Sequence, residues 1–255
     1  MKDLVSIIMP AHNSSATIMD SVNSVLNQSY SNFELIICND RSTDSTLNII
    51  ESIKDSRVVV VENKTFPGAS YARNTGLKIA KGRFVCFLDS DDIWHQSKLL
   101  TQISYMRTSG SYFSYGDYST FREQINFPVG SFFTPKSVSF KRLLYSCPIG
   151  CLTVMIDREI TGNFFMPNID KEDYATWLFL TKKFGQANKY EGNFAFYRIG
   201  HKSISSNKLV EVKKQYKVLR VVGNQTVLSS LIYVCFYVFL GLRKHLSYRL
   251  KNDDI

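Results

Sequence analysis

Three carboxylates stand within four residues, at Asp89, Asp91 and Asp92, directly after the apolar run 84–88. Carboxylates this close together repel one another, and their ionised forms are unfavourable unless a cation neutralises them. A hard divalent ion does so, and beside phosphates it typically takes one or two protein carboxylates together with phosphate oxygens. Asp91 and Asp89 are therefore candidate metal ligands. For Asp92 the alternative is an N-cap, because a helix is expected over residues 93–106.

A second acidic pair, Glu172 and Asp173, comes at the expected start of a helix. A hydroxyl that attacks an electrophilic carbon must lose its proton, and a carboxylate within hydrogen-bond reach can take it. The alternative is that both acids only complement the dipole of the helix in its first turn. The residues alone leave these two interpretations open.

The elements that must position these acids follow a simple pattern in the first half of the chain. Apolar runs alternate with amphipathic stretches, which predicts repeated βα units around a mostly parallel sheet. We expect strands at 5–9, 33–38, 58–61 and 83–88, and helices at 18–26, 43–53 and 70–80. Polar clusters follow the strands at their carboxyl ends, where open α/β sheets place ligands. Beyond residue 92 we expect loops and edge strands at 110–116 and 130–135.

Four motifs in this order resemble the family 2 inverting glycosyltransferases of GT-A fold. They are Pro10-Ala11-His12-Asn13, then Phe33-Glu34-Leu35-Ile36-Ile37 leading to Asp40 and Ser42-Thr43-Asp44, then Ala72-Arg73-Asn74-Thr75-Gly76, and Phe87-Leu88-Asp89-Ser90-Asp91-Asp92. The resemblance covers residues 1 to about 100 and continues more weakly to about 205. It implies a Rossmann-like sheet flanked by helices, and transfer of a hexose from a nucleotide sugar, usually a uridine diphosphate sugar.

The resemblance also implies roles for single residues on the donor side. The nucleobase and ribose would be held by Pro10, Ala11, His12, Asn13 and Asp40. Arg73 would face the nucleotide and its phosphates, where a guanidinium supplies charge-assisted hydrogen bonds; the alternative for Arg73 is a surface salt bridge. Asp91 would ligate Mn²⁺ or Mg²⁺ bridging the diphosphate, and Asp89 would touch the ribose or a metal-bound water.

On the acceptor side, the stretch 171–177 resembles the family's Glu-Asp motif, in which the second acid, here Asp173, is the general base. The segment that contains Arg198 and His201 resembles one that closes over the diphosphate and the acceptor, where cations offset the charge of the leaving group. Three positions depart from the family pattern. Asn39 replaces an acid, Arg41 replaces a glycine, and His12 replaces a tyrosine whose ring lies against the base.

Charge is distributed unevenly along the 255 residues. The net charge is +9, and residues 182–255 hold 14 Lys and Arg against 4 Asp and Glu, so the basic excess is C-terminal. Residues 221–242 carry no charge, and a basic cluster begins at Arg243. We expect 206–255 to be a basic and apolar membrane-associating segment that lies on the anionic inner leaflet, with a single transmembrane helix as the alternative. A buried core helix is the third possibility.

The five cysteines form no metal-ligand or disulfide pattern, and no signal peptide precedes the first strand, so we expect reduced thiols and a cytoplasmic, peripheral membrane protein. We expect a catalytic domain at 1–205, with a nucleotide-sugar-binding half at 1–100 and an acceptor half at 101–205. The acceptor expected at a membrane surface is a polyprenyl-diphosphate-linked saccharide of O-antigen or capsule synthesis.

Two other functions remain to be weighed at this point. A nucleotidyltransferase acting on sugar phosphates also uses an α/β sheet, a metal and carboxylates, but the first strand is not followed by a Gly-rich phosphate loop. A basic nucleic-acid-binding module needs cations interleaved with base-stacking aromatics. Here Phe236, Tyr237 and Phe239 lie inside the uncharged stretch instead, which favours contact with lipid, and no nucleic-acid partner is expected.

Overall fold

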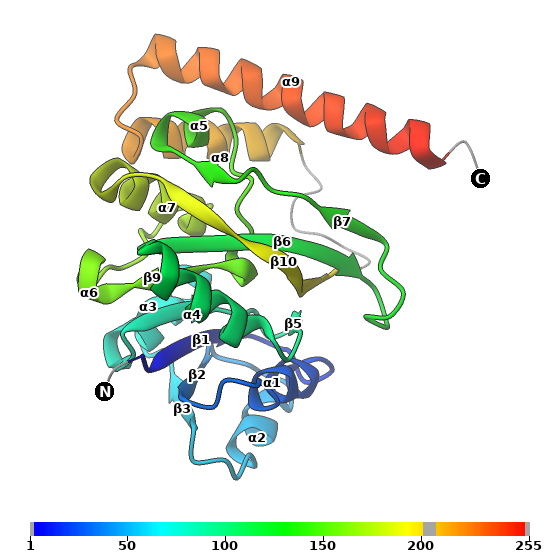
Figure 1. Ribbon diagram of the computed structural model, residues 1–255. Helices are drawn as coiled ribbons and strands as arrows, with labels where there is room; N and C mark the ends of the chain where they lie inside the picture. The colour runs from blue at the N-terminus through cyan, green and yellow to red at the C-terminus, as the bar shows by residue number, and fades with distance from the viewer. Residues whose placement is uncertain (1–2, 201–207, 253–255) are drawn as a thin grey trace.

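The computed structural model describes residues 3–200 and 208–252, of which residues 208 and 241–252 are described by their backbone only. The described strands belong to one twisted mixed sheet (Figure 1). They are β1 (Val5–Ala11), β2 (Phe33–Asn39), β3 (Val58–Glu62), β4 (Phe84–Phe87), β5 (Ile93–Trp94), β6 (Phe113–Phe121), β7 (Gly130–Phe132), β8 (Ser137–Val138), β9 (Met155–Asp157) and β10 (Ala187–Arg198).

The helices cover both faces of this sheet. They are α1 (Ile18–Leu26), α2 (Thr46–Glu51), α3 (Ala69–Ile79), α4 (Lys98–Ser109), α5 (Phe140–Tyr145), the short 3₁₀ turn η1 (Cys151–Thr153), α6 (Arg158–Thr161), α7 (Glu172–Phe184), α8 (Lys208–Val221) and α9 (Val227–Asn252). The expected α/β class is confirmed. The expected helix over 93–106 is displaced, because Ile93 and Trp94 form β5 and α4 starts only at Lys98.

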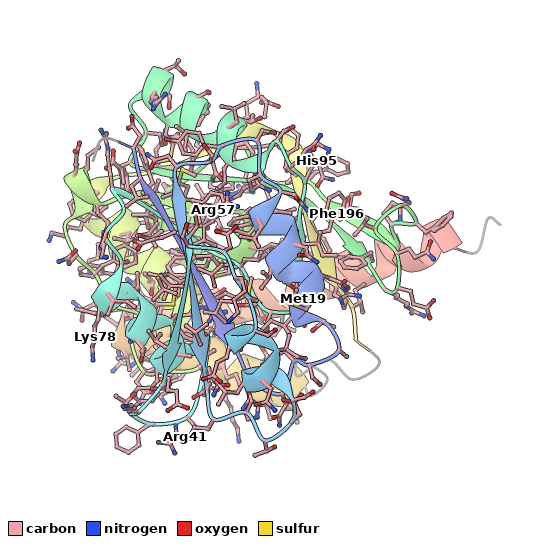
Figure 2. All side chains as sticks on the ribbon, turned by 90° about the horizontal axis from the view of Figure 1, so that it is seen from below. Met19, Arg41, Arg57, Lys78, His95 and Phe196 are labelled. Carbon is pink, nitrogen blue, oxygen red and sulfur yellow. The ribbon has the colours of Figure 1, made fainter. Side chains whose placement is uncertain are left out.

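Alternation along the first strands divides the core into two layers. Ile8 and Ile36 face one layer, while Ile7 and Leu35 face the other. The first layer also holds residues of α3, α5, α7 and α8, and the second holds residues of α1, α2 and α4. Figure 2 shows α1, which carries Met19, and α3, which carries Lys78, on opposite sides of the strands. This is the two-sided covering that a parallel sheet requires.

The first half of the sheet is wholly parallel, and the second half mixes both directions, since β10 pairs in parallel with β6. The strand order is β3-β2-β1-β4-β9-β6-β10-β5, with β7 beside β6 and β8 beside β10. Strands β1 to β4 pair in parallel, whereas β9 is antiparallel to both of its neighbours, β4 and β6. Loops and edge strands were expected around 110–116, but Phe113 begins a nine-residue interior strand, β6, which lies between β9 and β10 and is buried along most of its length.

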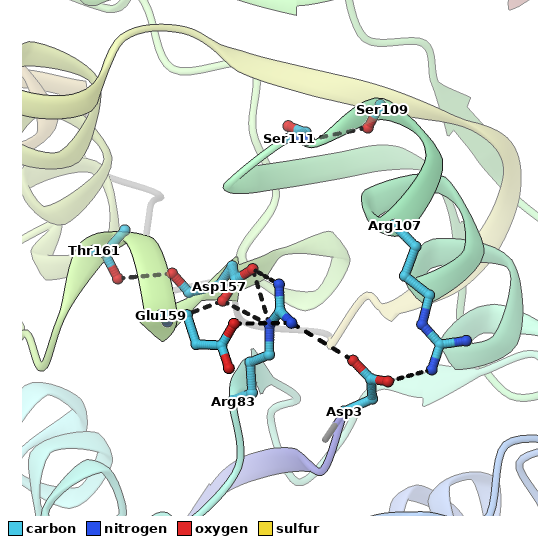
Figure 3. A network of polar contacts seen from close by, with 8 residues as sticks. All are labelled: Asp3, Arg83, Arg107, Ser109, Ser111, Asp157, Glu159 and Thr161. Carbon is cyan, nitrogen blue, oxygen red and sulfur yellow. Dashed lines mark hydrogen bonds and ion pairs between the residues drawn. The ribbon is translucent and has the colours of Figure 1, made fainter. Parts of the chain in front are cut away.

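A polar network at one end of the sheet joins β4 to β9 (Figure 3). Arg83, just before β4, donates to both carboxylate oxygens of Asp157 at the end of β9 and pairs with Glu159 at 2.9 Å. Asp3 lies 3.9 Å from Arg83 and 2.5 Å from Arg107 of α4. The network therefore ties the end of the antiparallel strand β9 to the start of β4.

The C-terminal helices pack on the layer that contains α5 and α7 (Figure 1). Val218 and Leu219 of α8 are fully buried there, and Val234 of α9 is 8% exposed. The division of the chain at residue 205 stays a prediction, but α8 is packed into the same core as the residues that precede it. Among the residues that the structure describes, no helix is long and apolar enough to cross a membrane.

Candidate active site

The loops after β1 and β2 are tied together at the carboxyl end of the sheet. Asn13 has a positive φ of 49°, and its side-chain oxygen accepts a hydrogen bond of 2.8 Å from the backbone N–H of Thr43. The backbone N–H of Asn13 donates to the Ser42 hydroxyl at 3.1 Å. Asn tolerates the left-handed region and makes such local bonds readily. The motif that starts at Pro10 and the one that follows β2 therefore form a single rigid edge.

Asp40 and His12 belong to this edge. A ring nitrogen of His12, Nδ1, lies 2.7 Å from the backbone oxygen of Asp40. The Asp40 carboxylate is buried and accepts hydrogen bonds of 2.7 Å each from the Asn63 side chain and the Gly68 backbone. Asp40 thus also anchors the loop that leads into α3. Asn63 was not among the predicted residues, although its place directly after β3 was a usable signal.

Arg73 links three segments of the site. It lies on α3, is 5% exposed, and its Nη2 lies 2.6 Å from the carboxylate of Asp89. Its other terminal nitrogen, Nη1, pairs with Glu172 at the start of α7. Burial opposes the charge of Arg73, but the surrounding carboxylates keep its pKa above the ordinary value. The alternative of a surface salt bridge is therefore wrong for Arg73.

The acidic pair at the start of α7 is brought next to Arg73. Burial raises the pKa of Glu172 and of Asp173, and the charge of Arg73 opposes the rise in both. One oxygen of Asp173 accepts a hydrogen bond of 2.6 Å from the Tyr174 backbone N–H. A carboxylate with a raised pKa is a better proton acceptor than an exposed one. Asp89, Arg73, Glu172 and Asp173 thus form one interacting group.

The turn at 89–92, which we call the acidic turn, holds the two carboxylates expected to bind a divalent cation, Asp89 and Asp91. The Asp91 side chain is exposed and makes no hydrogen bond or ion pair to another side chain in the described residues. Partial desolvation and the Asp89 carboxylate raise the pKa of Asp91. Within residues 3–200 and 208–252, no group of three or more His, Cys, Asp or Glu side chains is arranged to hold a metal by itself. A cation bound here would therefore need oxygens of a bound diphosphate besides Asp91.

Arg198 lies against the acidic turn. Its Nε donates to the Asp91 backbone oxygen at 2.8 Å, and its own backbone N–H donates to the buried Asp92 carboxylate at 3.0 Å. Its guanidinium also pairs with Asp20 at 3.0 Å and lies 4.6 Å from the centre of the Phe121 ring. Asp92 is therefore a buried acceptor for β10 and not a helix N-cap. His201 lies outside the described residues.

Comparisons with known proteins agree with this architecture. A crystal structure of S. aureus TarS 1-349 in complex with UDP-GlcNAc superposes with a TM-score of 0.69, covering 92% of this chain and 71% of that one at 20% identity. A mannosyltransferase from Pyrobaculum calidifontis in complex with GDP-Man and Mn²⁺ gives 0.63 over 90% and 69%, at 16% identity. The fold is thus that of the GT-A nucleotide-sugar transferases.

Sequence comparison identifies the family to which the chain belongs. Residues 6–159 match the model of glycosyl transferase family 2, and the chain belongs to this family. It is 43% identical to the UDP-Glc:alpha-D-GlcNAc-diphosphoundecaprenol beta-1,3-glucosyltransferase WfgD of Escherichia coli, covering 98% of this chain and 97% of WfgD. It is 44% identical to the putative teichuronic acid biosynthesis glycosyltransferase TuaG of Bacillus subtilis, over 86% and 88%. The chain is therefore an inverting glycosyltransferase, and the nucleotidyltransferase alternative is wrong.

Proposed function

We propose that this enzyme transfers glucose from UDP-glucose to the 3-hydroxyl of N-acetylglucosamine linked through a diphosphate to undecaprenol, forming a β linkage. This is one step in the assembly of a surface polysaccharide. Two relatives of 43% and 42% identity, each matched over 98% of this chain, carry names that state this donor, acceptor and linkage. A match over the whole length includes both the donor and the acceptor side of the fold.

The observation that carries the chemistry is the group formed by Asp89, Arg73, Glu172 and Asp173. The end of β4, helix α3 and the first turn of α7 converge on it, although Arg73 and Glu172 are 99 positions apart in sequence. Arg73 neutralises part of the negative charge, and burial keeps the pKa of Asp173 above its usual range. The group therefore has an acid that can accept a proton next to a fixed positive charge.

The proposed reaction is a single displacement. The ionised Asp173 carboxylate takes the proton of the acceptor hydroxyl as the oxygen attacks the anomeric carbon. The bond between that carbon and the diphosphate oxygen breaks, and UDP leaves with the electron pair. Attack from the face opposite the leaving group inverts the α-linked donor to a β-linked product. Pro10, Ala11, His12, Asn13 and Asp40 would hold the uridine.

A divalent cation would be held by Asp91, with Asp89 beside it, and Mn²⁺ or Mg²⁺ would neutralise charge on the departing diphosphate. Arg198 supports this position through the backbone of the acidic turn, since its Nε hydrogen-bonds the Asp91 carbonyl. Its proposed role is to orient Asp91. Because the Arg198 guanidinium also pairs with Asp20, it has fewer N–H donors available for the diphosphate than the sequence analysis expected.

We further propose that the enzyme lies on the inner face of the plasma membrane through α9. One face of α9 holds exposed apolar side chains at helical spacing, namely Leu228, Leu231, Ile232 and Phe239. We call these four residues the apolar face. The opposite side of α9 packs inward through the buried Ser230 and Val234. An amphipathic helix with a basic continuation suits an anionic lipid surface.

The proposed function is tested by offering purified enzyme and Mn²⁺ a panel of UDP-glucose, UDP-galactose and UDP-N-acetylglucosamine, with a short-chain N-acetylglucosaminyl diphospholipid as acceptor. The expected result is transfer from UDP-glucose alone and a β-1,3-linked disaccharide product. Transfer of another sugar would correct the donor. Donor binding without transfer to this acceptor, together with transfer to a different lipid-linked saccharide, would correct the acceptor.

A further inference from the structure

Lys171, which directly precedes Glu172 and Asp173, is held by the two C-terminal helices. Its ammonium Nζ lies 3.3 Å from the Glu211 carboxylate and 3.3 Å from the Gln215 side-chain oxygen, both on α8. It also lies 3.3 Å from the Tyr237 hydroxyl of α9 and 4.7 Å from the centre of the Tyr237 ring. An ammonium has three N–H donors, and these three oxygens are enough to engage all of them.

The backbone at Lys171 is unusual as well. Its φ of 59° puts a non-glycine residue in the left-handed region at the N-cap of α7. Such a conformation is uncommon and persists where surrounding contacts determine it. The lysine side chain carries those contacts here. The direction in which α7 starts thus depends on residues more than 40 positions further along the chain.

A second contact holds the other side of the acidic pair. Gln215 is 1% exposed, and its amide nitrogen donates to the Tyr174 hydroxyl at 3.0 Å. That hydroxyl in turn donates to the Leu143 backbone oxygen at 2.7 Å. Tyr174 directly follows Asp173. Helix α8 therefore fixes the residue before Glu172 and the residue after Asp173, and α9 adds the hydroxyl of Tyr237.

We propose that Lys171 is a positioning residue, through which α8 and α9 fix the first turn of α7 and so orient Asp173 toward the acceptor hydroxyl. The inference rests on the proposed role of Asp173 as general base. Lys171 also acts by charge, because it is one of the two cations that lower the pKa of Asp173 against the effect of burial. Losing Lys171 should therefore alter both the geometry and the titration of the base.

The test compares five variants of the enzyme with wild type, measuring turnover with acceptor, donor affinity, melting temperature and the pH dependence of turnover. Lys171→Met should lower turnover about tenfold or more, as small displacements of a catalytic group do. Donor affinity should stay within about twofold of wild type, because the donor contacts lie elsewhere. The acid limb of the pH profile should move to higher pH, since a charge that lowers the pKa of Asp173 is removed.

The remaining variants separate positioning from general stability. Lys171→Arg should restore part of the turnover. Tyr237→Phe removes one hydroxyl but keeps the ring and the lysine charge, so turnover should fall about two- to fivefold with an unmoved acid limb. Tyr233→Phe is the matched control, because Tyr233 lies one turn earlier on α9, packs edge-on against Tyr145 and is not among the hydrogen-bond, ion-pair or ring partners of Lys171 in the described residues. Its turnover should equal that of wild type.

Wild-type turnover and pH profile in Lys171→Met would overturn the proposal. So would a loss of turnover that follows the melting temperature and that Lys171→Arg does not relieve, because Lys171 would then only stabilise the fold. Should Lys171→Met fail to fold, Tyr237→Phe against Tyr233→Phe decides. Asp173→Asn distinguishes the two proposals: full activity removes the proposed base and this inference with it, whereas an inactive Asp173→Asn beside an unaffected Lys171→Met overturns the positioning role alone.

Discussion

Arg73 Nη2 lies 2.6 Å from the carboxylate of Asp89, and this ion pair joins the middle of α3 to the end of β4. Arg73 is almost wholly buried, and the side chain of Asp89 is 38% exposed. One partner is therefore fixed in the core, while the other reaches the surface of the site. The pair sets the position of the acidic turn relative to the acids of α7.

We expect Arg73→Lys to lower both stability and activity. Lysine keeps the charge, but a single ammonium lacks the planar fork with which Arg73 pairs Asp89 and Glu172 at once. An unpaired buried acceptor costs about 1–3 kcal/mol, which thermal or urea unfolding can measure. Turnover should fall at least about tenfold, because both acids lose their fixed partner.

The matched control is Arg57→Lys. Arg57 also pairs with a carboxylate at 2.7 Å, that of Asp55. The side chains of this pair are 30% and 26% exposed, whereas that of Arg73 is 6% exposed. An exposed pair contributes about 0–1 kcal/mol, so this variant should unfold and turn over much like wild type. Equal effects of the two substitutions would show that the buried pair has no special place in the site.

We expect Asp173→Asn to preserve donor affinity while lowering turnover by about 10² to 10⁴-fold, the usual contribution of a positioned proton acceptor. Asparagine keeps the shape and an oxygen for the Tyr174 N–H, so the melting temperature should barely change. A role only in the helix start predicts the reverse, a lower melting temperature with turnover per folded molecule intact.

The pH dependence of wild-type turnover gives a second measurement on Asp173. Burial raises the pKa of Asp173 above the ordinary value of an aspartate. A general base must be ionised, so turnover should be low at acid pH and rise as pH increases through this raised value. Asp173→Asn should lose that acid limb. A limb that stays at the same pH in the variant would assign it to another group, with Glu172 the first to examine.

We expect Asp91→Asn to weaken metal-dependent donor binding and to lower turnover steeply, because an amide replaces a charged ligand of a hard cation. Titrating Mn²⁺ against activity should show a higher metal requirement in the variant. Chelator treatment should reduce wild-type turnover, and added Mn²⁺ or Mg²⁺ should restore it. Wild-type enzyme that keeps full turnover in chelator would contradict the metal at this site.

We expect the double substitution Leu228→Glu and Leu231→Glu to release the protein from vesicles that contain anionic lipid. These side chains are 70% and 50% exposed, so the melting temperature should be little changed. Leu100→Glu on α4 is the control, since Leu100 is similarly exposed at 46% but lies away from α9. Substitution is preferable to truncation, because Val218 and Leu219 just before α9 are buried in the core.

The first half of the fold could be predicted because each of its elements is locally regular. The helix expected over 18–26 has those bounds, and strands β1 to β4 lie within a residue or two of the expected ranges. The second half lacks such regularity. Strand β6 is buried on both faces and so has no alternation, and β9 is only three residues long. Its antiparallel pairing depends on Arg83 and Asp157, 74 positions apart.

The candidate site divides in the same way. The acidic turn could be recognised in the sequence because its carboxylates are close together, and the role of Asp173, predicted from a short motif, stays a prediction. The contact of Arg73 with Glu172 and that of Lys171 with Tyr237 were not predictable, since each joins side chains that only the folded sheet and helices bring together. Arg73 and Arg198 were expected to face the substrate phosphates. In the structure, both form ion pairs with carboxylates of the protein.

The position of β9 between β4 and β6 has a consequence for synthesis of the chain. Until residue 157 has left the ribosome, β9 cannot pair with β4, so one edge of β4 is free. Strand β5 can pair with β10 only after residue 196 has emerged. An emerging chain therefore exposes an unpaired apolar edge through much of translation, and such edges favour association with other strands. We expect fragments that end near residue 100 to aggregate, so that biogenesis of this enzyme depends on completing its sheet from late-arriving strands.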